Sequence, residues 1–166
     1  MAHLIDRNGL RPDSWQAFDG TEGALPETAD LLVSLDVWRA QGARLKGHSG
    51  RLGLLLSPPD DVKSVASDLA HFELMAVHFP KFTDGRGYST ARLLRDRLGW
   101  RGELRATGEV LRDQLFLMAR CGFDSFSLRD DQDPQAALSA FRDFSVRYQA
   151  ATDEPQPLFR RRPAAA

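Results

Sequence analysis

Short apolar segments alternate with longer amphipathic segments through most of the chain, and this alternation constrains the fold more than any other feature of the sequence. The longer segments repeat apolar residues every three or four positions, as in Leu111, Leu115 and Met118, which predicts helices. The short segments are apolar on both faces, which is typical of parallel strands covered by helices. We therefore predict strands at five segments: LLVSL (31–35), LGLLL (52–56), LMAVHF (74–79), ELRA (103–106) and DSFSL (124–128).

This pattern predicts an α/β fold of about five mainly parallel strands that alternate with helices. An open doubly wound sheet is the first expectation. The alternative is a partial β/α barrel, because five strand–helix units are about half of the usual eight and a second copy could complete the barrel.

The chain of 166 residues is long enough for one domain with tails. Residues 1–30 show no sustained period and predict a loop-rich N-terminal arm, whose apolar residues we expect to attach it to the domain or to a partner. Residues 31–150 are expected to form the single α/β domain. Residues 151–166 hold three prolines and three consecutive arginines and predict a flexible tail.

Charge and cysteine content exclude several classes of protein. A net charge of -1 argues against the basic surface that binds nucleic acid or anionic membranes. One cysteine, Cys121, allows neither an intramolecular disulfide nor a cluster of thiolate metal ligands. The chain contains no apolar run of the roughly 18–20 residues that span a bilayer, and its start, MAHLIDRNGLRPDSW, mixes polar and apolar residues. We expect a cytoplasmic protein without metal, cofactor or membrane contact.

A glycine-containing segment, FPKFTDGRGYS (79–89), is the most unusual of the loops expected at the carboxyl ends of the strands, where α/β folds bind ligands. Its two glycines would let backbone amides converge, and its basic side chains would add charge, so the loop would suit a phosphate, sulfate or sulfite ion. The alternative is a glycine-assisted turn in which Asp84 pairs with Arg86 or caps the helix. The candidate anion- or partner-binding residues are Lys81, Asp84, Gly85, Arg86, Gly87, Tyr88, Ser89, Arg105 and Thr107.

Arg105 is included because a charge inside an apolar strand is rarely buried without a partner. It would either complete the anion site or pair with a carboxylate such as Glu103. His78 is expected to be a hydrogen-bonded residue of the sheet rather than an acid or base. Gln114 is expected to be a surface or interface residue rather than a ligand. Cys121 is expected to be a packed structural thiol, because a helix C-terminus disfavours a thiolate.

Four pieces of the sequence, FPKFTDGRGYS, GELRATG, LRDQL and RCGFD, occur in this order within residues 77–126. Together they resemble the core signature of a bacterial family catalogued as domain of unknown function 934. The family is associated with assimilatory sulfite reduction, so the resemblance implies a role beside sulfite reductase, with siroheme and iron–sulfur chemistry in that partner.

Two functions follow from this resemblance. In the first, the chain is an accessory protein that docks on sulfite reductase, and the loop holds a small oxyanion or a carboxylate of the partner. In the second, it is a small enzyme of the same pathway, an oxidoreductase or one that acts on a phosphorylated or sulfur-oxyanion substrate. Its residues would then be Lys81, Asp84, Arg86 and Arg105, although the sequence holds no flavin or nicotinamide fingerprint. A homo-oligomer is compatible with both functions.

Overall fold

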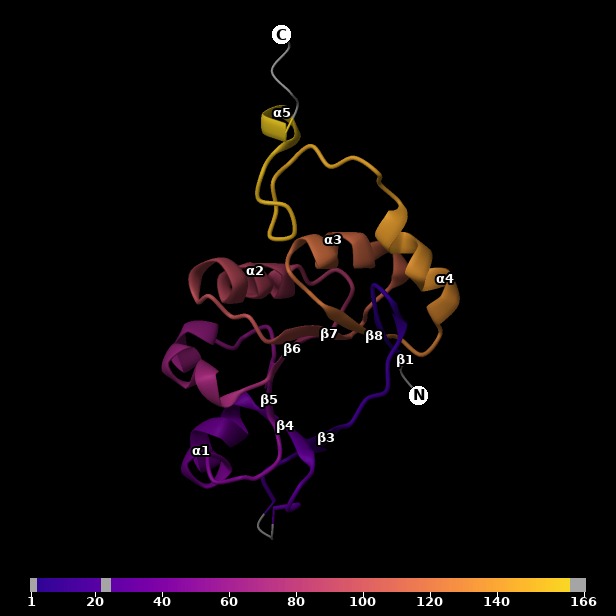
Figure 1. Cartoon of the computed structure of the whole chain (residues 1–166). Helices are drawn as coiled ribbons and strands as arrows, with labels where there is room; N and C mark the ends of the chain where they lie inside the picture. Colours follow the sequence, from indigo (N-terminus) through magenta and orange to yellow (C-terminus); the bar gives the residue numbers. More distant parts are fainter. Residues whose placement is uncertain (1–2, 22–24, 162–166) are drawn as a thin grey trace.

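The computed structural model describes residues 3–21 and 25–161, so parts of the predicted arm (1–2 and 22–24) and of the predicted tail (162–166) lie outside the described residues. The strands are β1 (His3–Asp6), β2 (Gly9–Leu10), β3 (Trp15–Phe18), β4 (Asp30–Ser34), β5 (Leu52–Leu56), β6 (Leu74–Phe79), β7 (Glu103–Gly108) and β8 (Ser125–Leu128). These eight strands form one sheet in the order β2-β1-β8-β7-β6-β5-β4-β3 (Figure 1).

The sheet is mostly parallel and curls into a half-barrel. Neighbouring strands from β3 to β8 run parallel, whereas β1 is antiparallel to both β8 and β2. From β4 to β8 each strand lies beside the strand that precedes it, so successive crossovers advance in one direction and place the helices on one face (Figure 1). This arrangement confirms the α/β class and the partial barrel given as the alternative. The doubly wound sheet is wrong, because that fold needs a point where the strand order reverses.

The number of strands differs from the prediction of about five. The five predicted strands correspond to β4 to β8, and the three further strands, β1, β2 and β3, lie in residues 1–30, which we expected to be loop-rich. Leu4 and Ile5 of β1 are buried because this strand pairs along the whole of β8. The N-terminal residues therefore extend both edges of the sheet.

The connecting helices are short. They are α1 (Leu35–Leu45), α2 (Arg86–Arg92), α3 (Leu115–Arg120), α4 (Pro134–Leu138) and α5 (Leu158–Arg161), with 3₁₀ helices η1 (Val62–His71), η3 (Arg112–Gln114) and η4 (Ser139–Arg142) and the π-helical turn η2 (Leu93–Arg97). Asp133 caps α4, whose first residue is Pro134, and Gly99 and Gly122 follow η2 and α3 with positive φ angles. The helix η1 begins at Val62 with Asp61 as its cap.

The hydrophobic core lies between the sheet and the helices on its convex side. Alternate strand residues point into it because side chains of a strand alternate between the two faces. The ring of Phe79 is fully buried at its centre, 5.3 Å from the ring of Tyr88 and 5.8 Å from that of Phe123. The strand residues of this core are Ile5, Leu31, Val33, Leu52, Leu54, Leu56, Met75, Val77, Phe79, Leu104, Ala106, Phe126 and Leu128.

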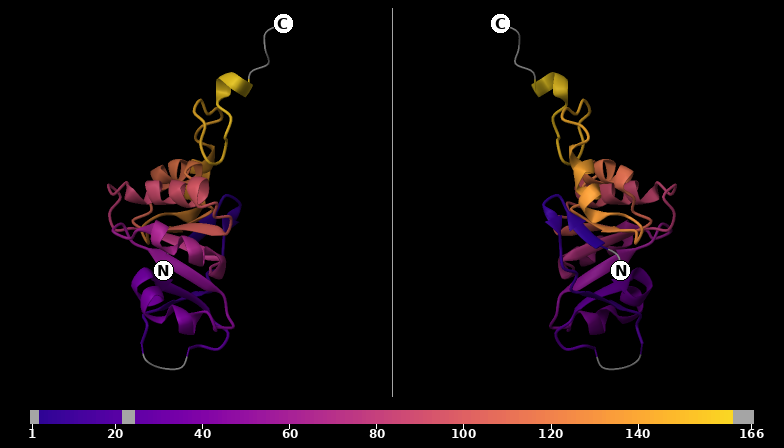
Figure 2. Two further views of the ribbon diagram at one scale, coloured as in Figure 1. Left: turned by 90° about the vertical axis from the view of Figure 1, so that its left-hand side faces the viewer. Right: turned by 90° about the vertical axis from the view of Figure 1, so that its right-hand side faces the viewer.

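After Arg142 the chain leaves the half-barrel and projects from it, as the yellow segment of Figure 2 shows. One turn of this segment returns to the body, where the backbone N–H of Thr152 donates to the carbonyl of Arg120 at 3.2 Å. Among the described residues, no helix combines the length and hydrophobicity needed to span a bilayer.

Candidate functional site

The loops at the carboxyl edge of the sheet meet, as parallel strands require. The backbone N–H of Glu109 donates to the carbonyl of Phe79 at 2.8 Å, which joins the loops after β7 and β6. The backbone N–H of Arg129 donates to the carbonyl of Val110 at 3.1 Å and joins the loop after β8 to them. The segment 79–89 is thus fixed between its neighbours at this edge.

Asp84 and Arg86 form an exposed ion pair within the segment. Nε and Nη2 of Arg86 donate to the two carboxylate oxygens of Asp84 at 3.0 and 2.7 Å, and the backbone N–H of Arg86 also donates to this carboxylate at 3.1 Å. The hydrogen bonds from the Arg86 side chain lower the pKa of Asp84 to about 2. The guanidinium is therefore already paired, which is the glycine-assisted turn of the alternative interpretation.

The two glycines of the segment have different roles. A Cβ atom at Gly87 would lie 2.5 Å from Cζ of Phe79, so only glycine lets α2 approach β6 this closely. Tyr88 then packs its ring edge against the same phenylalanine. By contrast, Gly85 has an ordinary φ angle of -80° and a Cβ atom there would meet nothing within 4 Å. Folding thus explains Gly87 and Tyr88 but not Gly85.

The remaining residues of the segment form an exposed surface. The backbone carbonyl of Lys81 accepts a hydrogen bond from the N–H of Asp84 at 3.0 Å, but its side chain makes no hydrogen bond or ion pair with any residue that the structure describes. Phe82 is 57% exposed, and its carbonyl accepts a hydrogen bond of 2.9 Å from Nε2 of Gln114. Ser89 is exposed beside a groove of about 430 Å³ between α2 and Cys121. Gln114, which we expected to be a surface or interface residue, therefore supports the backbone of the exposed Phe82.

Arg105 and Thr107 lie on the concave face of the half-barrel rather than in the loop. Arg105 is buried and donates to Asp13 at 2.9 Å and to Glu103 at 3.0 Å, which is the structural pairing given as an alternative. The hydroxyl of Thr107 donates to the carbonyl of Val77 at 3.4 Å. The structure therefore does not bring Arg105 together with Lys81 and Arg86.

His78 and Cys121 are both half-buried. The ring of His78 is half-buried beside the Gly108 backbone and makes no hydrogen bond with a described residue, so the expected side-chain hydrogen bond is absent there. Cys121 is half-buried at the end of α3, and this burial raises the pKa of its thiol. No group of three or more potential metal ligands occurs among residues 3–21 and 25–161.

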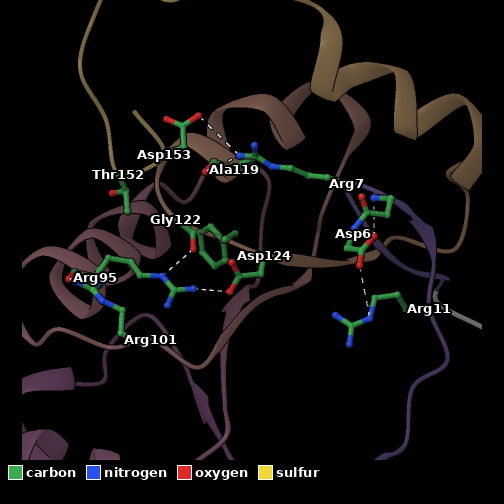
Figure 3. Close-up of a pocket in the computed structure, with 12 residues that line it drawn as sticks. Asp6, Arg7, Arg11, Arg95, Arg101, Ala119, Gly122, Asp124, Thr152 and Asp153 are labelled. Carbon is green, nitrogen blue, oxygen red and sulfur yellow. Dashed lines mark hydrogen bonds and ion pairs between the residues drawn. The ribbon is translucent and has the colours of Figure 1, made fainter. Parts of the chain in front are cut away.

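A second site lies at the opposite, amino edge of β7 and β8, where a cavity of about 470 Å³ opens (Figure 3). Arg95 is only 8% exposed there and donates to the carbonyls of Trp100, Gly102 and Gly122 and to the carboxylate of Asp124. The side chain of Arg95 therefore holds η2 against the start of β8. The charged residues of the cavity are Arg7, Arg11, Arg95, Arg101, Asp6, Asp124 and Asp153.

Sequence reasoning missed this cavity because its residues come from the N-terminal arm, η2, the start of β8 and the tail, and they share no spacing. The RCGFD piece was the only signal, since it contains Gly122 and Asp124.

Comparison with known proteins gives one match. The sequence model of a family described as bacterial protein of unknown function, DUF934, matches residues 53–159. The match includes the segment 79–89 and the RCGFD piece. Neither the curated proteins nor the solved structures include a match.

Proposed function

The chain belongs to the DUF934 family, and we propose that it is a cytoplasmic accessory protein of assimilatory sulfite reduction that docks on sulfite reductase through residues 79–89. The pathway comes from the association of the family with sulfite reduction. The observation that supports docking is the division of this segment into residues that the fold needs and residues that it does not need.

The residues without a role in folding are the ones that a partner would meet. Phe82 is held by Gln114 with its ring exposed, and a large aromatic side chain on a supported backbone is typical of an interface anchor. Leu117 of α3 is also exposed. Gly85 leaves space at the surface, so the backbone of a partner can approach there without meeting a side chain.

The charges of the segment favour an anionic ligand at Lys81. Because Asp84 already neutralises Arg86, the ammonium of Lys81, which has no partner within residues 3–21 and 25–161, is the stronger attraction for a carboxylate of the partner or for a small oxyanion. Either ligand would lie beside the exposed ring of Phe82 and extend the same docking surface.

The test is binding to sulfite reductase from the native host, measured by calorimetry with purified proteins. We expect Phe82→Ala and Lys81→Glu each to weaken binding at least tenfold while the free energy of unfolding stays unchanged. Leu10→Ala is the matched control, because Leu10 is also exposed but lies on β2 at the far edge of the sheet.

Two results would overturn this proposal. One is unchanged binding in both loop variants. The other is turnover of a phosphorylated or sulfur-oxyanion substrate by the chain alone, which would favour the enzyme alternative. A deletion strain that grows on cysteine but not on sulfate would show that the protein acts in the pathway. Equal growth on both would show that it does not.

A further inference from the structure

Three arginine side chains surround one aspartate where the C-terminal segment returns to the body. The side chain of Asp153 is 8% exposed, and its carboxylate lies 2.6 Å from Nη1 of Arg147, 3.6 Å from Nε of Arg120 and 3.8 Å from Nη2 of Arg7. Arg7 belongs to the β1–β2 turn and Arg120 to α3, so three separate parts of the chain meet here (Figure 3 shows Arg7 and Asp153).

The carboxylate of Asp153 does not satisfy all the hydrogen-bond donors of this cluster. Nε of Arg120 and Oδ1 of Asp153 are both buried, and neither has a hydrogen-bond partner among the described residues. One negative charge also faces three positive charges, and the side chain of Arg120, at 15% exposure, is the least solvated of the three arginines. An anion with two charges and three or four oxygens would match these donors better than one carboxylate does.

The cluster is open to solvent on one side. Arg7 and Asp153 line the cavity of about 470 Å³, whose wall also carries Arg101. Arg7 is 45% exposed, so a small anion can reach it from solution. Arg95 contributes little, because its donors are occupied by three carbonyls and Asp124.

The turn that carries Asp153 is attached by few bonds. Apart from the ion pairs of Asp153, the turn of residues 151–154 is attached to the body by two hydrogen bonds of Thr152, from its backbone N–H to the carbonyl of Arg120 and from its hydroxyl to Asp96 at 3.3 Å. The pairing of Ala151 with Glu154 and the ion pair of Glu154 with Arg161 lie within the projecting segment itself. A segment with so few contacts opens at low free-energy cost.

We propose that Arg7 and Arg120 form a binding site for a small doubly charged oxyanion of the sulfate, sulfite or phosphate class, and that Asp153 occupies this site as an internal counter-ion. The oxyanion takes the place of the carboxylate and releases the turn of residues 151–154. This site lies at the edge of the sheet opposite to residues 79–89, so it is independent of the proposed docking surface.

The test compares the affinities of inorganic sulfate, sulfite and phosphate at constant ionic strength, with chloride as the reference, in wild type and Asp153→Asn. We expect each bound oxyanion to bind the variant at least tenfold more tightly, because the internal competitor is gone. Asp143→Asn is the matched control, since Asp143 pairs with Arg112 at the surface and should give no gain. The anion with the highest affinity identifies the ligand within the class.

A second pair of variants keeps the test decisive if Asp153→Asn fails to fold. Arg7→Gln, made in the otherwise wild-type protein, should weaken the binding of the oxyanion at least fivefold. Arg112→Gln should not, although the exposed fraction of the Arg112 side chain (42%) is similar to that of Arg7 (45%). Equal binding in Arg7→Gln and wild type, or an equal gain for chloride in Asp153→Asn, would overturn the proposal. Phe82→Ala should leave oxyanion binding intact, so failure of this site and failure of the docking surface are distinguishable.

Discussion

The backbone of Gly87 lies directly against the ring of Phe79, because a Cβ atom at position 87 would be 2.5 Å from Cζ of that ring. This contact fixes the distance between α2 and β6 and thereby the position of the loop that joins them. The exposed residues of the proposed docking surface, Lys81, Phe82 and Gly85, lie on that loop.

Gly87→Ala should destabilise the fold by about 1–3 kcal/mol, since the added methyl group overpacks the contact with Phe79. Gly85→Ala is its control, because that position has open space and a φ angle that any residue adopts, so its free energy of unfolding should stay within about 1 kcal/mol of wild type. Urea unfolding of both variants is the measurement. Equal stability of the two variants would show that the close contact does not constrain α2.

The order of strands and helices from residue 31 onwards could be predicted because short, mainly apolar segments alternate there with segments of helical period. The strands β1 and β2 span only four and two residues, and they are held in the sheet by pairing, β1 with β8 and β2 with β1, rather than by a pattern of their own. The curl of the sheet into a half-barrel depends on the direction of the crossovers, which apolar periodicity does not encode. For that reason both the doubly wound sheet and the partial barrel remained compatible with the sequence.

The candidate site was predictable only where the residues are neighbours in the sequence. The Asp84–Arg86 pair could be given as an alternative because the two residues are two positions apart. Arg105 also pairs with Asp13 of the N-terminal arm, which is 92 positions away, and no pattern in the sequence indicates this pair. The cluster around Asp153 likewise joins residues from both ends of the chain.

Arg95→Met should lower the free energy of unfolding by about 3 kcal/mol or more, because three backbone carbonyls and Asp124 lose a shared donor. Arg95→Lys should recover only part of this loss, since an ammonium cannot span acceptors placed around a planar guanidinium. Arg112→Met, which removes an exposed ion pair, should cost less than about 1 kcal/mol. A loss in Arg95→Met no larger than that of Arg112→Met would contradict this role.

The stability of the protein should fall in acid partly through Asp30. Hydrogen bonds from Arg51 and then from Ser14 hold the pKa of Asp30 well below its usual range. A carboxyl whose pKa is lower in the folded than in the unfolded state stabilises the fold above its unfolded pKa of about 3.9, and this stabilisation is lost as the pH falls towards the folded pKa.

Wild type should therefore exceed Asp30→Asn in urea midpoint by a constant amount above about pH 5, and the difference should shrink between about pH 4 and pH 2. Arg51→Gln should reduce this pH-dependent difference in the same way, because it removes the main cause of the lowered pKa. A difference that stays constant down to pH 2 would show that Asp30 acts through packing rather than through its charge.

Cys121 should react slowly with iodoacetamide in the native protein at pH 7.5. Burial raises the pKa of its thiol and outweighs the opposing effect of Arg92 and Arg120, so little thiolate is present at this pH. The rate should increase when the protein is unfolded in urea, which removes the burial. We also expect Cys121→Ser to support growth on sulfate, at a cost of about 1–2 kcal/mol in stability. A faster reaction in the native than in the unfolded protein, or loss of growth with a folded variant, would instead identify Cys121 as a functional group.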